Sequence, residues 1–112
     1  MKVSIKEQRS VCVLSLEGTI MGGPDATLLN EEIHSLLDKG KKHIVVDLSA
    51  VDAMNSSGLG MLISGLTATK NAGGRLTLAA ASTKILGLLA VTKLTKLFEH
   101  FPTIQAAVDS YS

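Results

Sequence analysis

Two adjacent serines, Ser56 and Ser57, stand in a short polar turn that leads directly into an apolar segment. The turn follows an apolar run over residues 44–48 that is rich in β-branched side chains and typical of a buried strand. After it, apolar residues recur from Leu59 onward at the spacing of an amphipathic helix. A hydroxyl at such a junction lies near free backbone N–H groups and the positive end of the helix dipole. The position therefore suits either a helix cap or a hydroxyl that takes up a phosphate.

The residues around these serines do not complete the enzymatic motifs that a glycine-containing turn can suggest. Gly58 and Gly60 supply two glycines of the dinucleotide-binding pattern G-x-G-x-x-G, but Ile63 occupies the third place. The turn also lacks the G-K-[ST] sequence of a P-loop and the leading glycine of a nucleophile elbow. The three histidines are too widely spaced to indicate a catalytic triad or a metal site. These enzymatic motifs are therefore set aside, and we expect no metal or cofactor.

Two carboxylates, Asp47 and Asp52, lie close to the turn in sequence. We interpret them as hydrogen-bonding loop residues rather than as a metal-binding pair. Asp47 also stands near the place of a phosphoacceptor aspartate in a response-regulator receiver. A receiver needs an acidic pair after its first strand, however, and Lys6-Glu7-Gln8 follows the first strand here. The receiver interpretation is therefore set aside.

Length and composition indicate one globular domain that spans residues 1–112. Hydrophobic residues make up 46% of the chain and charged residues 19%, proportions that exclude a disordered protein. The net charge is +1 and aromatic residues make up only 3%. The chain thus lacks the one-signed field and the stacking groups that bind nucleic acid or an anionic membrane. We expect neither among its partners.

The single cysteine, Cys12, cannot form a disulfide within the chain, which agrees with a reducing cytosol. No apolar run approaches the length of a membrane-spanning helix. The first residues lead straight into a strand pattern and do not have the layout of a signal peptide. The expected location is the cytoplasm.

Two strand patterns open the chain, over residues 3–6 and 11–16. The polar segment 7–10 between them is short, so the two strands should form an antiparallel hairpin. A glycine-containing loop follows, and Pro24 then suits the first position of a helix that Gly40 ends.

Strands and helices alternate in the rest of the chain. After the strand and helix that flank the serines, a fourth strand is predicted over 76–80 and a third helix is capped by Ser82. Segment 94–101 is expected to be a connector with one short strand, and Pro102 to start the last helix.

This order predicts an α/β fold: a mixed sheet of four to five strands, antiparallel in the opening hairpin and then parallel, with about four helices. The loops at the carboxyl ends of parallel strands gather at one edge of such a sheet. We therefore expect the segments 18–24 and 49–58 to meet there.

The segments 47–51, Asp-Leu-Ser-Ala-Val, and 55–60, Asn-Ser-Ser-Gly-Leu-Gly, resemble the signature of STAS domains. The resemblance is specifically to the bacterial anti-sigma factor antagonists and covers essentially the whole chain. Supporting similarity lies in Leu16-Glu17-Gly18, Gly74-Arg75-Leu76 and the pattern Leu94-x-x-Leu97-Phe98.

The resemblance implies a cytosolic switch protein without enzymatic activity. Such antagonists bind an anti-sigma factor kinase of the histidine-kinase ATPase type and thereby free the sigma factor. The kinase phosphorylates the hydroxyl residue immediately before the glycine, which is Ser57 here, and a PP2C-class phosphatase resets the switch. Ser56 is the second choice for phosphorylation and the expected helix cap.

The partner-binding surface implied by the resemblance is formed by the two loop segments and the start of the second helix. Its residues are Met21, Gly22, Gly23, Asn55, Ser56, Ser57, Gly58, Leu59 and Met61. The family usually has acidic residues where this chain has Asn55 and Met21. The alternative is a STAS adaptor subunit that is not phosphorylated, for instance in a lipid-transport or stress-signalling complex.

Overall fold

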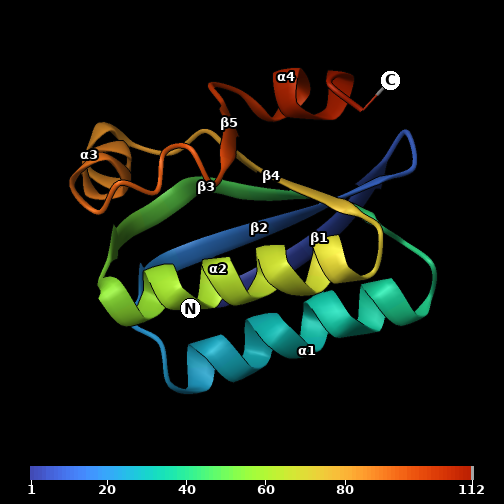
Figure 1. The fold of residues 1–112 in the computed structure, drawn as a ribbon, viewed down its shortest axis with the longest axis horizontal. Helices are drawn as coiled ribbons and strands as arrows, with labels where there is room; N and C mark the ends of the chain where they lie inside the picture. Colours follow the sequence, from blue (N-terminus) through green and yellow to red (C-terminus); the bar gives the residue numbers. More distant parts are fainter. Residues whose placement is uncertain (112) are drawn as a thin grey trace.

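A mixed five-stranded sheet forms the centre of the computed structural model, which describes residues 1–111 (Figure 1). The strands are β1 (Lys2–Gln8), β2 (Val11–Ile20), β3 (His43–Met54), β4 (Arg75–Ala79) and β5 (Glu99–Phe101). The helices are α1 (Pro24–Asp38), α2 (Ser56–Asn71), α3 (Thr83–Val91) and α4 (Ile104–Asp109). The strands lie in chain order, with β1 antiparallel to β2 and all other neighbours parallel. The predicted fold class is confirmed.

The helices cover the two faces of the sheet unequally. α1 and α2 lie side by side on one face, and α4 lies on the other (Figure 1). The larger core lies under α1 and α2 and includes Leu14, Leu29, Ile33, Val46, Leu62 and Leu78, all at most 1% exposed. α3 lies at one end of the molecule and contributes Ile85 and Leu89 to this larger core. A smaller apolar cluster joins α4 to Val13, Val45 and Ala79 of the sheet.

The hairpin between β1 and β2 is tighter than predicted. Strand pairing continues to Gln8 and Val11, so the turn consists only of Arg9 and Ser10. Both turn residues have positive φ angles, 53° and 65°. Two such residues match the right-handed twist of the flanking strands. The expected four-residue turn over 7–10 was therefore too long.

β2 and β3 also extend beyond their predicted ends, as far as Ile20 and Met54. Much of what was expected as loops 18–24 and 49–58 is consequently strand. The pairing continues across two register shifts, the second of them between Gly18 and Thr19. Such irregularities break the simple alternation of apolar and polar side chains. The buried side chains of Ile20 and Val51 still anchor both extensions in the core.

Helix ends follow local chemistry in most places. The Ser82 hydroxyl accepts from the backbone N–H of Ile85 and caps α3, as predicted. Gly40 follows α1 with a φ of 79°, as expected of a residue that ends a helix. The last helix begins at Ile104 and not at Pro102, because Thr103 accepts from a free N–H of the first turn and acts as the cap.

The C-terminal segment is fastened to the sheet through Tyr111. Its hydroxyl donates to the backbone carbonyl of Ile44 at 2.5 Å. The guanidinium of Arg75 lies 4.5 Å from the centre of the Tyr111 ring and forms an ion pair with Glu99 at 2.7 Å. These contacts hold α4 against the face of the sheet opposite α1 and α2.

Candidate functional site

The turn that carries the serines is organised by Asn55, the N-cap of α2. Its backbone is extended, with φ −96° and ψ −178°. Its side-chain oxygen accepts from the backbone N–H of Gly58 at 2.8 Å. This bond satisfies one of the N–H groups that a helix start leaves free.

Ser56 was expected to be the helix cap, and this prediction was wrong. Ser56 and Ser57 are the first two residues of α2 itself, and both are exposed. Asparagine is at least as favourable as serine at an N-cap, and the side chain of Asn55 reaches a second partner as well. It donates to the backbone carbonyl of Met21 at 3.3 Å. Asn55 is itself a favourable capping residue in the sequence, and the cap was predicted one position too far along the chain.

The loop between β2 and α1 packs directly against the serine turn. Besides the bond from Asn55 to Met21, the backbone N–H of Asn55 donates to the carbonyl of Ile20 at 3.2 Å. Gly22 lies against Ser57: a β-carbon added to this glycine would lie only 2.7 Å from the Ser57 β-carbon. The predicted meeting of the two segments is confirmed, although the loop parts are short.

The nine residues predicted as a partner-binding surface divide into an exposed and a buried set. The exposed or partly exposed residues are Met21, Gly23, Asn55, Ser56 and Ser57. Gly22 is buried against Ser57, and Gly58 is buried against the ends of β2 and β3. Leu59 and Met61 are each only 3% exposed and belong to the core under α2. Of these nine residues, the exposed set can therefore contact another molecule directly.

The burial of Leu59 has a signal in the sequence, because this residue begins the apolar stripe of the helix. Met61 is also part of this core, whose other members are mostly aliphatic. Both residues support the start of α2 from beneath.

The serine hydroxyls lie in the first turn of α2, which contains no acidic residue. The positive end of the helix dipole lies at the same place, and free N–H groups of a first turn can hydrogen-bond to anions. Chemically, this arrangement can donate hydrogen bonds to acceptor groups of a partner or accommodate an added phosphate.

The two aspartates near the turn have separate environments. Asp47 is 5% exposed, and its carboxylate accepts from the Ser15 hydroxyl and from the Ser49 backbone N–H, each at 2.9 Å. Asp52 is exposed. Asp47 is thus a hydrogen-bonding residue as predicted, although it lies within strand β3 and not in a loop.

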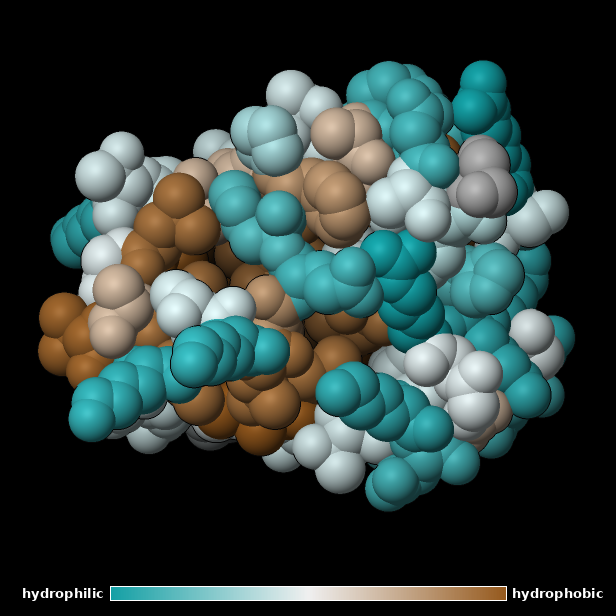
Figure 2. Space-filling model, turned by 45° about the horizontal axis from the view of Figure 1, so that its top comes forward, coloured by the Kyte–Doolittle hydropathy of each residue, from teal (hydrophilic) through white to brown (hydrophobic). Residues whose placement is uncertain are grey.

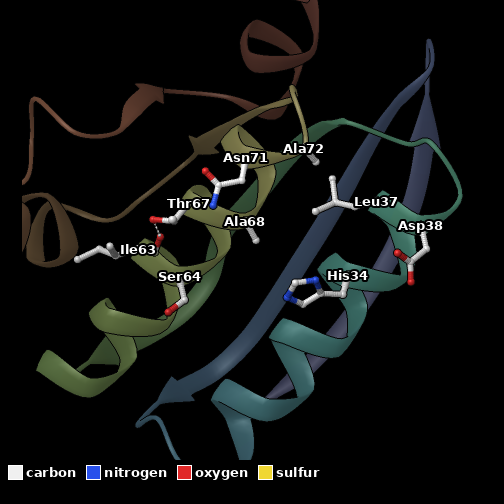
Figure 3. A pocket seen from close by; sticks show the side chains of 9 residues that line it. All are labelled: His34, Leu37, Asp38, Ile63, Ser64, Thr67, Ala68, Asn71 and Ala72. Atoms are coloured by element: carbon white, nitrogen blue, oxygen red, sulfur yellow. Dashed lines mark hydrogen bonds between the residues drawn. The ribbon is translucent and has the colours of Figure 1, made fainter.

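A shallow groove of about 620 Å³ lies between α1 and α2, and none of its lining residues belongs to the serine turn. Figure 3 shows side chains from both helices along this groove, where the hydroxyl of Thr67 donates a hydrogen bond to the backbone carbonyl of Ile63. Its lining residues are His34, Leu37, Asp38, Ile63, Ser64, Thr67, Ala68, Asn71 and Ala72. Within residues 1–111, no group of three metal-ligating side chains comes together.

The fold and the site define a class of protein: a small mixed α/β domain that presents a pair of hydroxyl groups where a strand turns into a helix. The model of the STAS domain family matches residues 2–107, and the chain therefore belongs to this family. In the part of the chain that the structure describes, no helix has the length and apolar character required to cross a membrane.

Solved structures with this fold include anti-sigma factor antagonists. TM1081 from Thermotoga maritima has a TM-score of 0.87 at 24% identity, over 96% of this chain and 92% of that one. An anti-sigma factor antagonist from Mycobacterium paratuberculosis has a TM-score of 0.83 at 25% identity, over 97% and 92%. The Bacillus protein SpoIIAA in its phosphorylated form has a TM-score of 0.75 at 18% identity, over 99% and 100%. The likeness to TM1081 and SpoIIAA shows a shared fold.

Proposed function

We propose that this STAS protein is an anti-sigma factor antagonist controlled by phosphorylation of Ser57. The observation that carries the proposal is the division of roles at the start of α2. Asn55 provides the cap, so the exposed hydroxyl of Ser57 is not needed to hold the helix. Ser57 lies at the second helical position, where an added phosphate is stabilised by the helix dipole.

In this proposal the unphosphorylated protein binds an anti-sigma factor kinase of the histidine-kinase ATPase type. The exposed part of the serine turn and the adjoining residues Met21 and Gly23 form the contact. The chain itself acts by binding and not as an enzyme, and its place of action is the cytoplasm.

Phosphorylation ends the contact because it changes the charge of a surface that has been removed from water. A phosphoserine carries roughly −1.5 to −2 charges at neutral pH. Placing such a charge in a desolvated contact without a partner costs several kcal/mol, which corresponds to orders of magnitude in affinity. The fold itself is unaffected, since Ser57 is exposed and contacts Gly22 through its β-carbon and backbone. A PP2C-class phosphatase then removes the phosphate and restores binding.

Mass spectrometry of protein purified from its own host tests whether the switch exists. The proposal predicts phosphate on Ser57 in some growth conditions and its disappearance in Ser57→Ala. Ser56→Ala is the matched control, because it removes the neighbouring exposed hydroxyl and should leave the phosphate in place.

A second candidate function is a STAS adaptor subunit that binds constitutively, for instance in a lipid-transport or stress-signalling complex. It is favoured by the neutral pair Asn55 and Met21, which are joined by a hydrogen bond where family members usually have acidic residues. Absence of phosphate on Ser57 across growth conditions would support this adaptor and contradict the switch.

A further inference from the structure

An apolar surface lies around α3, at the end of the molecule that also contains the start of α2 (Figure 1). Val91 is 82% exposed and Leu97 39% exposed, high values for large apolar side chains. Beside Val91 is a pocket of about 270 Å³ lined by Met54, Lys84, Ile85, Gly87, Leu88 and Val91. Figure 2 shows apolar side chains gathering at this end of the molecule. We refer to the pocket residues together with Leu97 as the α3 surface.

Charged residues are distributed unevenly between the α3 region and helix α1. The segment 83–98 contains Lys84, Lys93 and Lys96 and has no acidic residue. Helix α1, by contrast, contains four acidic residues and no lysine or arginine. The small net charge of the chain therefore conceals a basic region around the α3 surface.

The α3 surface is continuous with the serine turn through Met54. This residue lines the pocket and directly precedes the cap residue Asn55. Its side chain also lies close to Gly58, whose added β-carbon would be 3.0 Å from Met54 Cγ. A molecule that contacts the exposed serines can thus reach the α3 surface without crossing an intervening element.

We propose that the α3 surface docks an acidic segment of a protein partner that inserts an apolar side chain into the pocket. The lysine at the pocket rim and the two that follow α3 complement negative charge, and the pocket complements a single aliphatic or aromatic anchor. A concave site favours a protruding side chain over a flat lipid surface. The inference extends the proposed function, because it adds a second contact to the partner of the serine turn.

The test uses a short helical peptide with leucines on one face and glutamates on the other. Amide signals of the intact protein are followed by NMR during titration. We expect shifts at Met54, Leu88, Val91 and Leu97, and weaker binding as salt concentration rises. Lys84→Glu and Val91→Gln should each lower the affinity for the peptide by about tenfold. Lys6→Glu, an equal charge reversal on the exposed strand β1, should leave binding unchanged.

Four results would overturn the inference. These are an absence of peptide binding, equal binding of the same peptide with lysine in place of glutamate, capture instead by phosphatidylglycerol vesicles, and self-association that Val91→Gln abolishes. The last two would assign the surface to a membrane or to a second copy of the chain. Peptide binding requires no phosphate on Ser57, so Ser57→Ala should retain it. A peptide that does not bind and a Ser57 that is not phosphorylated are therefore separate outcomes, and each tests a different proposal.

Discussion

The side chain of Ser57 lies directly against the α-carbon of Gly22, with no room for a β-carbon between the two residues. The loop after β2 and the first turn of α2 therefore form one packed unit. Asn55 adds a hydrogen bond to Met21 across the same contact. The exposed hydroxyl of Ser57 is thus presented on a supported backbone.

Replacing Gly22 by alanine tests this contact. The variant should lose more stability than Gly40→Ala, its matched control, in urea unfolding. Gly22 and Gly40 have similar positive φ angles, 82° and 79°, so each alanine costs about 1–2 kcal/mol in backbone strain. Only the methyl group at position 22 also meets Ser57, whereas a methyl group at position 40 meets no neighbouring atom. Equal losses in the two variants would contradict the packing.

Replacing Asn55 by alanine tests which residue caps α2. We expect a loss of about 1–2 kcal/mol in the free energy of unfolding, because the N–H of Gly58 and the carbonyl of Met21 both lose a partner. Ser56→Ala and Ser57→Ala should change stability by less than about 0.5 kcal/mol, as exposed positions do. A loss in Ser56→Ala as large as in Asn55→Ala would return the capping role to Ser56.

Acidification should destabilise the protein through His100. Partial burial lowers the pKa of His100 below its ordinary value of 6.5, and its Nε2 accepts from the backbone N–H of Ala81 at 3.2 Å. The unfolded chain therefore binds a proton more readily than the folded protein does. The contribution of neutral His100 to the free energy of unfolding is complete above pH 6.5 and is lost as the pH falls below this value.

Thermal unfolding between pH 7.5 and 5.5 measures this effect. His100→Gln should have a weaker pH dependence than the wild type over this range, because the titrating group is removed. The matched control is the exposed His34→Gln, which should retain the wild-type slope. An unchanged slope in His100→Gln would show that His100 does not contribute.

Tyr111→Phe tests the attachment of α4 to the sheet. The ring and its cation–π contact with the Arg75 guanidinium are kept, but the bonds of the hydroxyl to the carbonyls of Ile44 and Arg75 and to the Thr77 hydroxyl are lost. We expect a loss of about 1–2 kcal/mol in unfolding free energy, because the hydroxyl and its partners lose their hydrogen bonds. Hydrogen exchange should quicken in α4 and leave α2 as it is. Equal quickening in both helices would contradict a local attachment.

Most of the architecture could be predicted because apolar periodicity and the glycine and proline positions agree with each other. Gly40, Ser82 and the apolar stripe from Leu59 all have in the structure the roles that their chemistry suggests. The ends of β2 and β3 could not be predicted in the same way. A register shift beside Gly18 moves side chains to the other face, so the alternation on which strand prediction depends is interrupted.

The candidate site was only partly accessible to sequence reasoning. A motif identifies which residues are near each other in the chain, but it does not say which of them face solvent. Met61 was assigned to the surface by its place in the motif, and the structure puts it in the core. The contact between Gly22 and Ser57 depends on how the loop after β2 packs against the first turn of α2, and no local pattern contains that information.

The affinity of the protein for its anti-sigma factor kinase tests the central claim most directly. Calorimetric titration would compare the wild type with Ser57→Ala and Ser57→Asp, using Ser56→Asp as a control for added charge at the neighbouring exposed position. We predict that Ser57→Ala binds within a few-fold of the wild type and that Ser57→Asp binds about 100-fold more weakly, a difference of about 3 kcal/mol. Binding of Ser57→Asp as tight as that of the wild type would contradict the account.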